Sequence, residues 1–224
     1  MRRIFTAGLM LFPIAVFAQT SAPRVNVDYT ILATPQPVYA PTRGKIEVAE
    51  VFSYACGACA SANAAVGAWN KTKAPDVNFV YVHSVAQGGA WERFARGFFA
   101  ADVKKIQARS HDALFQAVFV DQSLSHSASL EDIAKFYSKF GVTSAQMLAI
   151  MNSPSINAKL NRSKQFSLRT GANSTPTIIV AGKYKVNSTR AGGFPGMMKT
   201  VDFLVAKERV AISARTAAKP VTAK

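Results

Sequence analysis

The sequence contains only two cysteines and three histidines among its 224 residues. A structural zinc site needs four ligands, usually supplied as two pairs of cysteine or histidine residues. The histidines, His83, His111 and His126, lie in different segments, so no second pair accompanies the cysteines. Covalent haem attachment needs the pattern C-x-x-C-H, and alanine follows the second cysteine here. We therefore expect neither a metal nor a cofactor, and we interpret the histidines as ordinary surface or core residues.

Acidic residues are also scarce, with 12 Asp and Glu against 27 Lys and Arg, which gives a formal net charge of +15. Such a charge favours contact with anionic surfaces. No basic run with interleaved aromatic residues is present, so we do not expect a nucleic-acid partner. We interpret the basic side chains as solvated and spread over many faces of a globular chain, whose hydrophobic content is 49%.

A hydrophobic run long enough to cross a bilayer, about 20 residues, is missing as well. The sequence nevertheless begins with "MRRIFTAGLMLFPIAVFAQT", in which two arginines precede a shorter apolar run that Pro13 interrupts. A charged start, a short apolar stretch and a small residue such as Ala18 are typical of a secretory signal peptide. We predict a signal peptide over residues 1–18, cleaved after Ala18, with an uncleaved anchor as the alternative. The mature chain is then exported to a compartment where disulfides persist.

Both cysteines lie in one short stretch, "AEVFSYACGACAS", where Gly57 and Ala58 separate Cys56 from Cys59. The segment before them, 45–54, is short, mostly apolar and rich in β-formers, which predicts a buried strand. The segment after them is rich in alanine and predicts a helix. The cysteines are therefore expected between a strand end and a helix start, with Cys56 at or just before the helix N-terminus.

This position favours redox chemistry at the two cysteines. The unpaired N–H groups and the dipole of a helix N-terminus stabilise a thiolate, as we expect for Cys56. A thiolate is the nucleophile and the better leaving group in disulfide exchange. Cys59, one turn further, is expected to be more buried and able to resolve a mixed disulfide. The alternative is an inert structural disulfide, but closing so small a loop gains little chain entropy.

A carboxylate interrupts the apolar strand that precedes the cysteines. Glu50 lies in "VAEVF", six residues before Cys56. Burying a carboxylate is costly unless it has a partner or a task, and its charge state would be coupled to that of nearby cysteines. We predict that Glu50 transfers a proton to or from Cys59. The alternative is that Glu50 simply points to the surface at the strand end.

The rest of the chain predicts an α/β arrangement with a helical block in the middle. A strand is expected over 77–85, and a β-hairpin at "TPTIIVAGKYKV" with its turn at Ala181-Gly182. A last helix is expected over 194–210. Between these parts, near-helical spacing of apolar residues predicts five helices, over 90–106, 110–122, 129–141, 143–153 and 154–169. Helices flanking a mixed sheet would cover both of its faces.

At this point two segments become recognisable. "VFSYACGACAS" and "NSTPTIIVAGKY" resemble the bacterial DsbA family of thiol:disulfide interchange proteins, and the resemblance covers about residues 25–210. It implies an α/β protein with a thioredoxin-like fold, a mixed central sheet and an inserted all-helical domain. We accordingly assign 19–88 and 169–210 to the thioredoxin-like domain, 89–168 to the helical insertion and 211–224 to a disordered basic tail.

The resemblance also implies roles for residues outside the cysteine pair. Pro176 would be a cis proline packed against the disulfide, although from the sequence alone it could be an ordinary trans proline at a strand start. Thr175 would offer its backbone groups to an extended substrate segment, and Glu50 matches the family's buried acid. The chain departs from the strongly oxidising members, which commonly carry Pro-His where it has Gly57-Ala58. Its oxidising power is therefore expected to be milder.

The function that these features predict is that of a periplasmic thiol:disulfide oxidoreductase. It would donate the Cys56–Cys59 disulfide to unfolded, newly exported proteins through a mixed disulfide and leave reduced. The resemblance suggests reoxidation by a membrane quinone-linked partner of the DsbB kind, and we expect a monomer because no dimerisation segment is visible. Two alternatives remain: a reductase or isomerase of the same fold, and a chaperone-like binding module with an inert disulfide.

Overall fold

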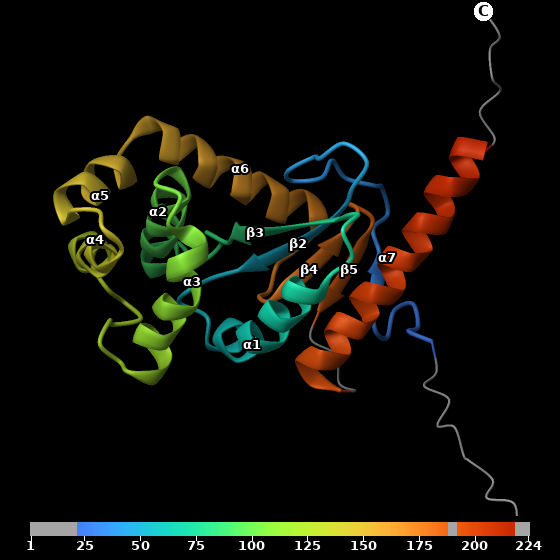
Figure 1. Cartoon of the computed structure of the whole chain (residues 1–224), viewed down its shortest axis with the longest axis horizontal. Coiled ribbons are helices and arrows are strands. Elements are labelled where there is room, and N and C mark those ends of the chain that lie inside the picture. The colour runs from blue at the N-terminus through green and yellow to red at the C-terminus, as the bar shows by residue number, and fades with distance from the viewer. Residues whose placement is uncertain (1–21, 188–191, 218–224) are drawn as a thin grey trace, which may run out of the picture.

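The computed structural model describes residues 22–187 and 192–217. The predicted signal peptide and the last seven residues of the predicted tail lie outside these described residues. The described chain forms a five-stranded mixed sheet with strand order β1-β5-β4-β2-β3, surrounded by helices (Figure 1). The strands are β1 (Thr30–Ile31), β2 (Ile46–Phe52), β3 (Val77–His83), β4 (Thr177–Val180) and β5 (Tyr184–Asn187).

The helices follow the predicted order. They are α1 (Gly57–Thr72), α2 (Gly89–Val103), α3 (Gln107–Phe115), α4 (Leu130–Tyr137), α5 (Ser144–Met151), α6 (Pro154–Thr170) and α7 (Gly193–Ala217). A π-helical turn, η1 (Gln116–Val120), continues α3, and a 3-10 turn, η2 (Ser138–Phe140), continues α4. None of the helices within the described ranges is both long and apolar enough to cross a membrane.

The central strand β2 positions the site. All seven of its residues are buried, because β3 pairs with it in parallel on one edge and β4 in antiparallel on the other. Helices α1 and α7 cover one face of the sheet and α6 covers the other (Figure 1). A strand buried on both faces reads as a nearly continuous apolar run, which is why the sequence revealed it.

Helices α2 to α5 gather beyond one end of the sheet (Figure 1), where they share a core with the end of β2. Phe52 and Tyr54 extend from the strand into this core. Their rings lie 5.4 and 6.2 Å from the ring of Phe98, and 6.1 and 5.0 Å from that of Phe115. The aromatic residues of the helical block are therefore largely core residues, and they tie the block to the sheet.

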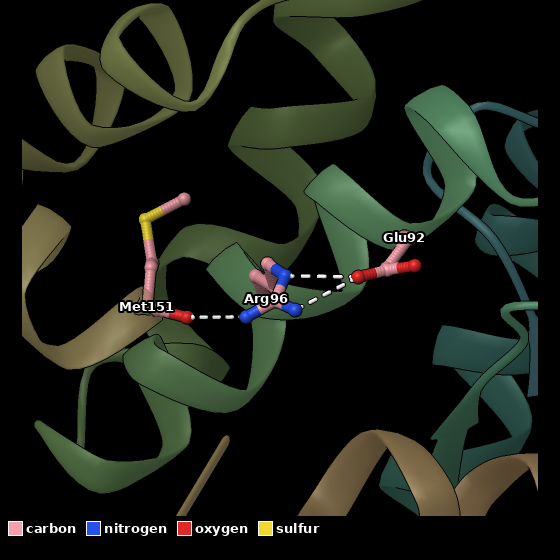
Figure 2. Close-up of polar contacts among 3 residues, drawn as sticks. All are labelled: Glu92, Arg96 and Met151. Carbon is pink, nitrogen blue, oxygen red and sulfur yellow. Dashed lines mark hydrogen bonds and ion pairs between the residues drawn. The ribbon is translucent and has the colours of Figure 1, made fainter. Parts of the chain in front are cut away.

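Polar contacts fix the helices of the block at their ends. Arg96 of α2 donates from Nε and Nη2 to Glu92 one turn earlier, at 3.1 and 2.8 Å, and from Nη1 to the carbonyl oxygen of Met151 at 2.9 Å (Figure 2). This arginine therefore connects α2 to the last residue of α5. Two helices also begin with a capping box: Ser129 caps α4 and Thr143 caps α5.

One prediction is wrong in part. The tail was expected to be disordered from residue 211, but α7 continues through Ala217. The extra turns contain Ala211, Ala214 and Ala217, and alanine has the highest intrinsic helix propensity. No glycine or proline interrupts the sequence before Pro220, so nothing local ends the helix at residue 210.

Candidate active site

Cys56 is the N-cap residue of α1, as the sequence predicted. Its backbone is extended, with φ −107° and ψ 113°, and its Sγ accepts a hydrogen bond from the backbone N–H of Cys59 at 3.4 Å. The turn that leads from β2 into the helix is held by Ser53, whose carbonyl oxygen accepts from the N–H of Cys56 at 3.1 Å and whose Oγ accepts from Ala55. The local sequence thus places a thiol where free helix N–H groups point.

The loop before β4 completes the site. The carbonyl oxygen of Thr175 lies 3.5 Å from Sγ of Cys56. The Thr175–Pro176 peptide bond is cis, as the family resemblance implied. Thr177 Oγ1 donates to the carbonyl oxygen of Ser174 at 2.7 Å and closes this loop at the strand start. The structure therefore brings together three of the predicted site residues, Cys56, Thr175 and Pro176.

The two cysteines, present as free thiols, differ sharply in acidity. A hydrogen bond from the Cys59 side chain is the main cause that lowers the pKa of Cys56 to about 6. The Thr175 side chain and the backbone N–H groups of Cys59 and Ala58 act in the same direction, against partial burial. Burial, followed by the neighbouring Cys56, raises the pKa of Cys59 far above its ordinary value. At neutral pH the pair therefore holds one thiolate on Cys56 and one proton on Cys59.

Glu50 lies inside the protein and not at the surface. Glu50 is only 3% exposed, so the alternative that it points to the surface at the strand end is wrong. Strand alternation places it between Val48 and Phe52 on the face that α1 covers. Burial, together with the charge of Cys56, raises the pKa of this carboxyl to about 8. Glu50 is therefore mostly protonated at pH 7.

The helical block contributes a residue that the sequence analysis missed. A Cβ atom placed on Gly57 would lie 3.6 Å from Cε1 of Phe119, so η1 lies beside the exposed motif residue Gly57. The next residue, Val120, is 66% exposed. No spacing in the sequence pointed to this contact, because the two segments meet only through the tertiary fold. π-Helical turns are frequent at functional sites.

Two histidines lie in the core, one of the two positions expected for them. His83 and His111 are both buried and both pack against Phe52. His111 Nδ1 is 2.8 Å from the hydroxyl of Tyr54, and His83 Nε2 accepts from the backbone N–H of Tyr54 at 3.2 Å. Burial lowers the pKa of His83 to about 3 and that of His111 to about 4. Both rings are neutral at pH 7 and connect β2 and β3 to α3.

Comparisons with known proteins agree with this geometry. Residues 47–196 match the family model of the DSBA-like thioredoxin domain. The chain is 30% identical over 209 residues to the thiol:disulfide interchange protein DsbA of Pseudomonas aeruginosa, which covers 93% of this chain and 97% of that protein. The DsbA of Azotobacter vinelandii is 28% identical over 208 residues, covering 92% and 95%.

A solved structure gives the same result for the fold. The crystal structure of the oxidoreductase DsbA from Xylella fastidiosa superposes with a TM-score of 0.79 at 34% identity, covering 85% of this chain and all of that one. The thioredoxin-like fold with a mixed sheet is thereby confirmed, as is the resemblance on which it was predicted. The chain belongs to the DSBA-like thioredoxin domain family and is a thiol:disulfide oxidoreductase.

Proposed function

We propose that this enzyme works as an oxidase in the periplasm and donates the Cys56–Cys59 disulfide to exported proteins that still carry free cysteines. One observation carries the direction of the reaction. The pKa of Cys56 is held at about 6, so the dithiol form contains a stabilised thiolate. Whatever stabilises the reduced form of a cysteine pair makes its disulfide a stronger oxidant.

The reaction proceeds through a mixed disulfide. A substrate thiolate attacks Sγ of Cys56, the Cys56–Cys59 bond breaks, and Cys59 leaves as a thiolate that must take up a proton. The second thiolate of the substrate then attacks the substrate sulfur, and Cys56 leaves as a thiolate. The substrate loses two electrons and gains a disulfide, while the enzyme gains those electrons. Cys56 is the attacked atom because it is half-exposed, whereas Cys59 is buried.

Glu50 is the proton donor in this scheme. It is protonated at pH 7, because its pKa is raised to about 8, and it lies on the face of β2 that α1 covers. A buried thiolate leaving group is unstable without a proton, as the raised pKa of Cys59 shows. Transfer of the proton from the carboxyl of Glu50 to the sulfur of Cys59 makes that departure easier.

The substrate surface lies around Cys56. Thr175 presents its backbone beside Sγ of Cys56, which suits an extended segment added in the manner of a strand. On the side of η1, Phe119 and Leu124 line a cavity of about 460 Å³ between η1 and the following loop, and Val120, next to Phe119 in the sequence, is exposed. An apolar border beside a reactive sulfur suits an unfolded chain, which exposes its own apolar side chains.

The compartment and the reoxidising partner are proposed from the predicted signal peptide and from the family. We assign the enzyme to the periplasm as a monomer, with cleavage after Ala18 and reoxidation by a membrane quinone-linked oxidase of the DsbB kind. A reductase or isomerase of the same fold is the second candidate. The Gly57-Ala58 pair favours it, because no side chain between the cysteines carries a charge that would stabilise the thiolate.

The reduction potential distinguishes the two directions. Equilibration of the purified enzyme in glutathione buffers is expected to give a value well above about −220 mV, the upper end of the cytosolic glutathione poise. A value near that of thioredoxin, about −270 mV, would instead support the reductase. A disulfide that stays oxidised at every buffer ratio would instead support a chaperone-like binding module with an inert disulfide.

Activity is tested with matched cysteine variants. Cys56→Ser is expected to abolish oxidation of a reduced, unfolded test protein, and Cys59→Ser is expected to accumulate the mixed disulfide through Cys56. Ser61→Ala, one turn further along α1, is the control and should oxidise at the wild-type rate. Full activity of Cys56→Ser would end the proposal.

A further inference from the structure

A buried carboxyl that gives up a proton must regain one before the next turnover, and the residue beside it decides how. In the parallel pairing of β2 and β3, Glu50 lies directly opposite Tyr81. Paired residues on neighbouring strands are about 4.8 Å apart and project to the same face. Tyr81 is therefore the neighbour of Glu50 on β3, whereas the neighbour on β4 is the apolar Ile178.

The ring of Tyr81 is held from three sides. Its centroid lies 4.2 Å from that of His111, 4.8 Å from that of Phe79 and 5.4 Å from that of Phe52. His111 is itself fixed by the hydroxyl of Tyr54 at 2.8 Å. The side chain thus has a defined orientation set by β2, β3 and α3, which a positioning role requires.

Tyr81 also reaches solvent, whereas Glu50 does not. Tyr81 is only partly buried. Burial is the main cause that raises the pKa of its phenol, and the carboxyls of Glu50 and Asp112 act electrostatically in the same direction. Asp112 lies on α3 and accepts a hydrogen bond from Asn63 of α1 at 2.9 Å, so the two form a polar rim between the helices. Tyr81 is therefore within electrostatic range of both the buried carboxyl and this rim.

The other titratable groups around the pair are few. Cys56 and Cys59 belong to the start of α1, while His111 and Asp112 come from α3 and Tyr54 follows β2. Among the described residues no lysine or arginine contributes to the shifted acidity of Glu50. The electrostatic environment of this carboxyl is therefore set by burial and by the charge of Cys56, and the hydroxyl of Tyr81 on the neighbouring strand is a group that can donate a hydrogen bond.

We propose that Tyr81 is a positioning residue for Glu50, and that its hydroxyl stabilises the ionised carboxylate while a proton returns from the polar rim. This inference rests on the proposed role of Glu50. The steps balance in protons and move no electrons. The carboxyl gives its proton to the Cys59 thiolate, and the resulting carboxylate takes a proton from solvent at the rim, beside Asp112 and Asn63.

Two substitutions at one position give shifts of opposite sign. In Tyr81→Phe the ring stays and the donor is lost, so the carboxylate is less stabilised and the pKa of Glu50 is expected to rise by about one unit. In Tyr81→Lys a cation replaces the hydroxyl, and the pKa of Glu50 is expected to fall by about one unit or more. The carboxyl stretch in infrared spectra, assigned by its loss in Glu50→Gln, follows this titration directly.

The matched control is Tyr137→Phe. Tyr137 is also a buried tyrosine, and its hydroxyl has no hydrogen-bond partner in the described chain. It lies on α4, so its removal is expected to leave the titration of Glu50 unchanged. Reduction of the enzyme by a small thiol, which releases Cys59, gives a second measurement. The midpoint of its pH profile is expected to move to higher pH in Tyr81→Phe, to lower pH in Tyr81→Lys, and to stay unchanged in Tyr137→Phe.

Each outcome is decisive. An unchanged titration in Tyr81→Phe would overturn the inference, and so would equal shifts in Tyr81→Phe and Tyr137→Phe, since these would indicate a general effect of removing hydroxyls. If Tyr81→Lys does not fold, the comparison of the two phenylalanine variants still decides. The infrared readout needs no turnover, so a protein that titrates as expected but has a reductase-like potential would contradict the oxidase assignment and not this inference.

Discussion

The carbonyl oxygen of Thr175 lies 3.5 Å from Sγ of Cys56, although 119 residues separate them in the sequence. The sheet explains this proximity. Strands β2 and β4 are antiparallel neighbours, and Val51 near the end of β2 pairs with Thr177 at the start of β4. The turn that follows β2 and the loop that precedes β4 therefore meet at the same end of the sheet. A substrate bound at the sulfur of Cys56 would contact both.

The acidity of Cys56 predicts how the reduced enzyme reacts with an alkylating agent. Because the thiolate is the nucleophile and the pKa of Cys56 is about 6, the rate with iodoacetamide should rise with pH through a midpoint near that value. Cys59 is buried and its pKa is raised, so only one thiol should react. Mass spectrometry after a short exposure gives both results. A midpoint near 8.5, the ordinary value for a cysteine, would contradict the stabilised thiolate.

The same acidity predicts a pH dependence of stability in the reduced form. The folded pKa of Cys56 lies below its unfolded value, so its ionisation contributes stability that is present above the unfolded pKa and lost as pH falls toward 6. The Tm difference between the reduced wild type and Cys56→Ala should therefore grow between pH 6 and pH 8.5. A constant difference over this range would mean that the folded protein does not stabilise the thiolate.

Substitution of Ala58, one of the two residues between the cysteines, is expected to change the reduction potential. Ala58 is exposed in the first turn of α1, and its N–H already acts on Cys56. A histidine there can place a partial positive charge beside the thiolate, so Ala58→His is expected to lower the pKa of Cys56 further. Each unit corresponds to about 1.4 kcal/mol, or about 30 mV of greater oxidising potential. Ala58→Gln, which adds a polar side chain without a charge, should leave the potential near the wild-type value.

Ionisation of Glu50 is expected to destabilise the fold, whereas ionisation of Cys56 stabilises it. The folded pKa of Glu50, about 8, lies above the unfolded value, so the carboxyl costs stability as pH rises from about 4.5 toward 8. Glu50→Gln removes this cost and should stabilise the protein by a few kcal/mol at pH 8.5, with little effect at pH 4.5. Denaturant unfolding at the two pH values measures the difference. Equal effects at both would mean that folding does not raise the pKa of this carboxyl.

Much of the fold could be predicted because local patterns and tertiary structure agree. The apolar run at 45–54 became β2, and the five helices expected between residues 90 and 169 correspond to α2 through α6. The strand-to-helix position of Cys56 followed from the same local reasoning. The cis peptide at Pro176 did not: it came only from the family resemblance, because a single proline carries no local sign of its isomer.

The contacts that surround the site could not be read from the sequence. Pairing of Glu50 with Tyr81 depends on the register between β2 and β3. A shift of this register by one residue would place the two side chains on opposite faces of the sheet. Contact between Phe119 and Gly57 depends on how the helical block docks onto the sheet. Both relationships join segments whose own patterns indicate only a strand and a helix, so only the packed structure shows them.

A pair of glycines tests how tightly the helical block is packed. A Cβ atom at Gly97 of α2 would lie 2.7 Å from Cγ2 of Ile133 and 3.1 Å from Cε2 of Tyr137, both on α4. Gly97→Ala is therefore expected to force the two helices apart and to destabilise the protein by about 1–3 kcal/mol. Denaturant midpoints with unchanged slopes would measure this loss.

The matched control is Gly67 of α1, where a Cβ atom meets nothing within 4 Å. Gly67→Ala gains helix propensity without a clash and should stabilise the protein by up to about 1 kcal/mol. The same substitution is thus predicted to have opposite signs in two helices. Stabilisation at both positions would mean that α2 and α4 have room to separate, and the helical block would then hold η1, and Phe119 within it, less firmly against the cysteines.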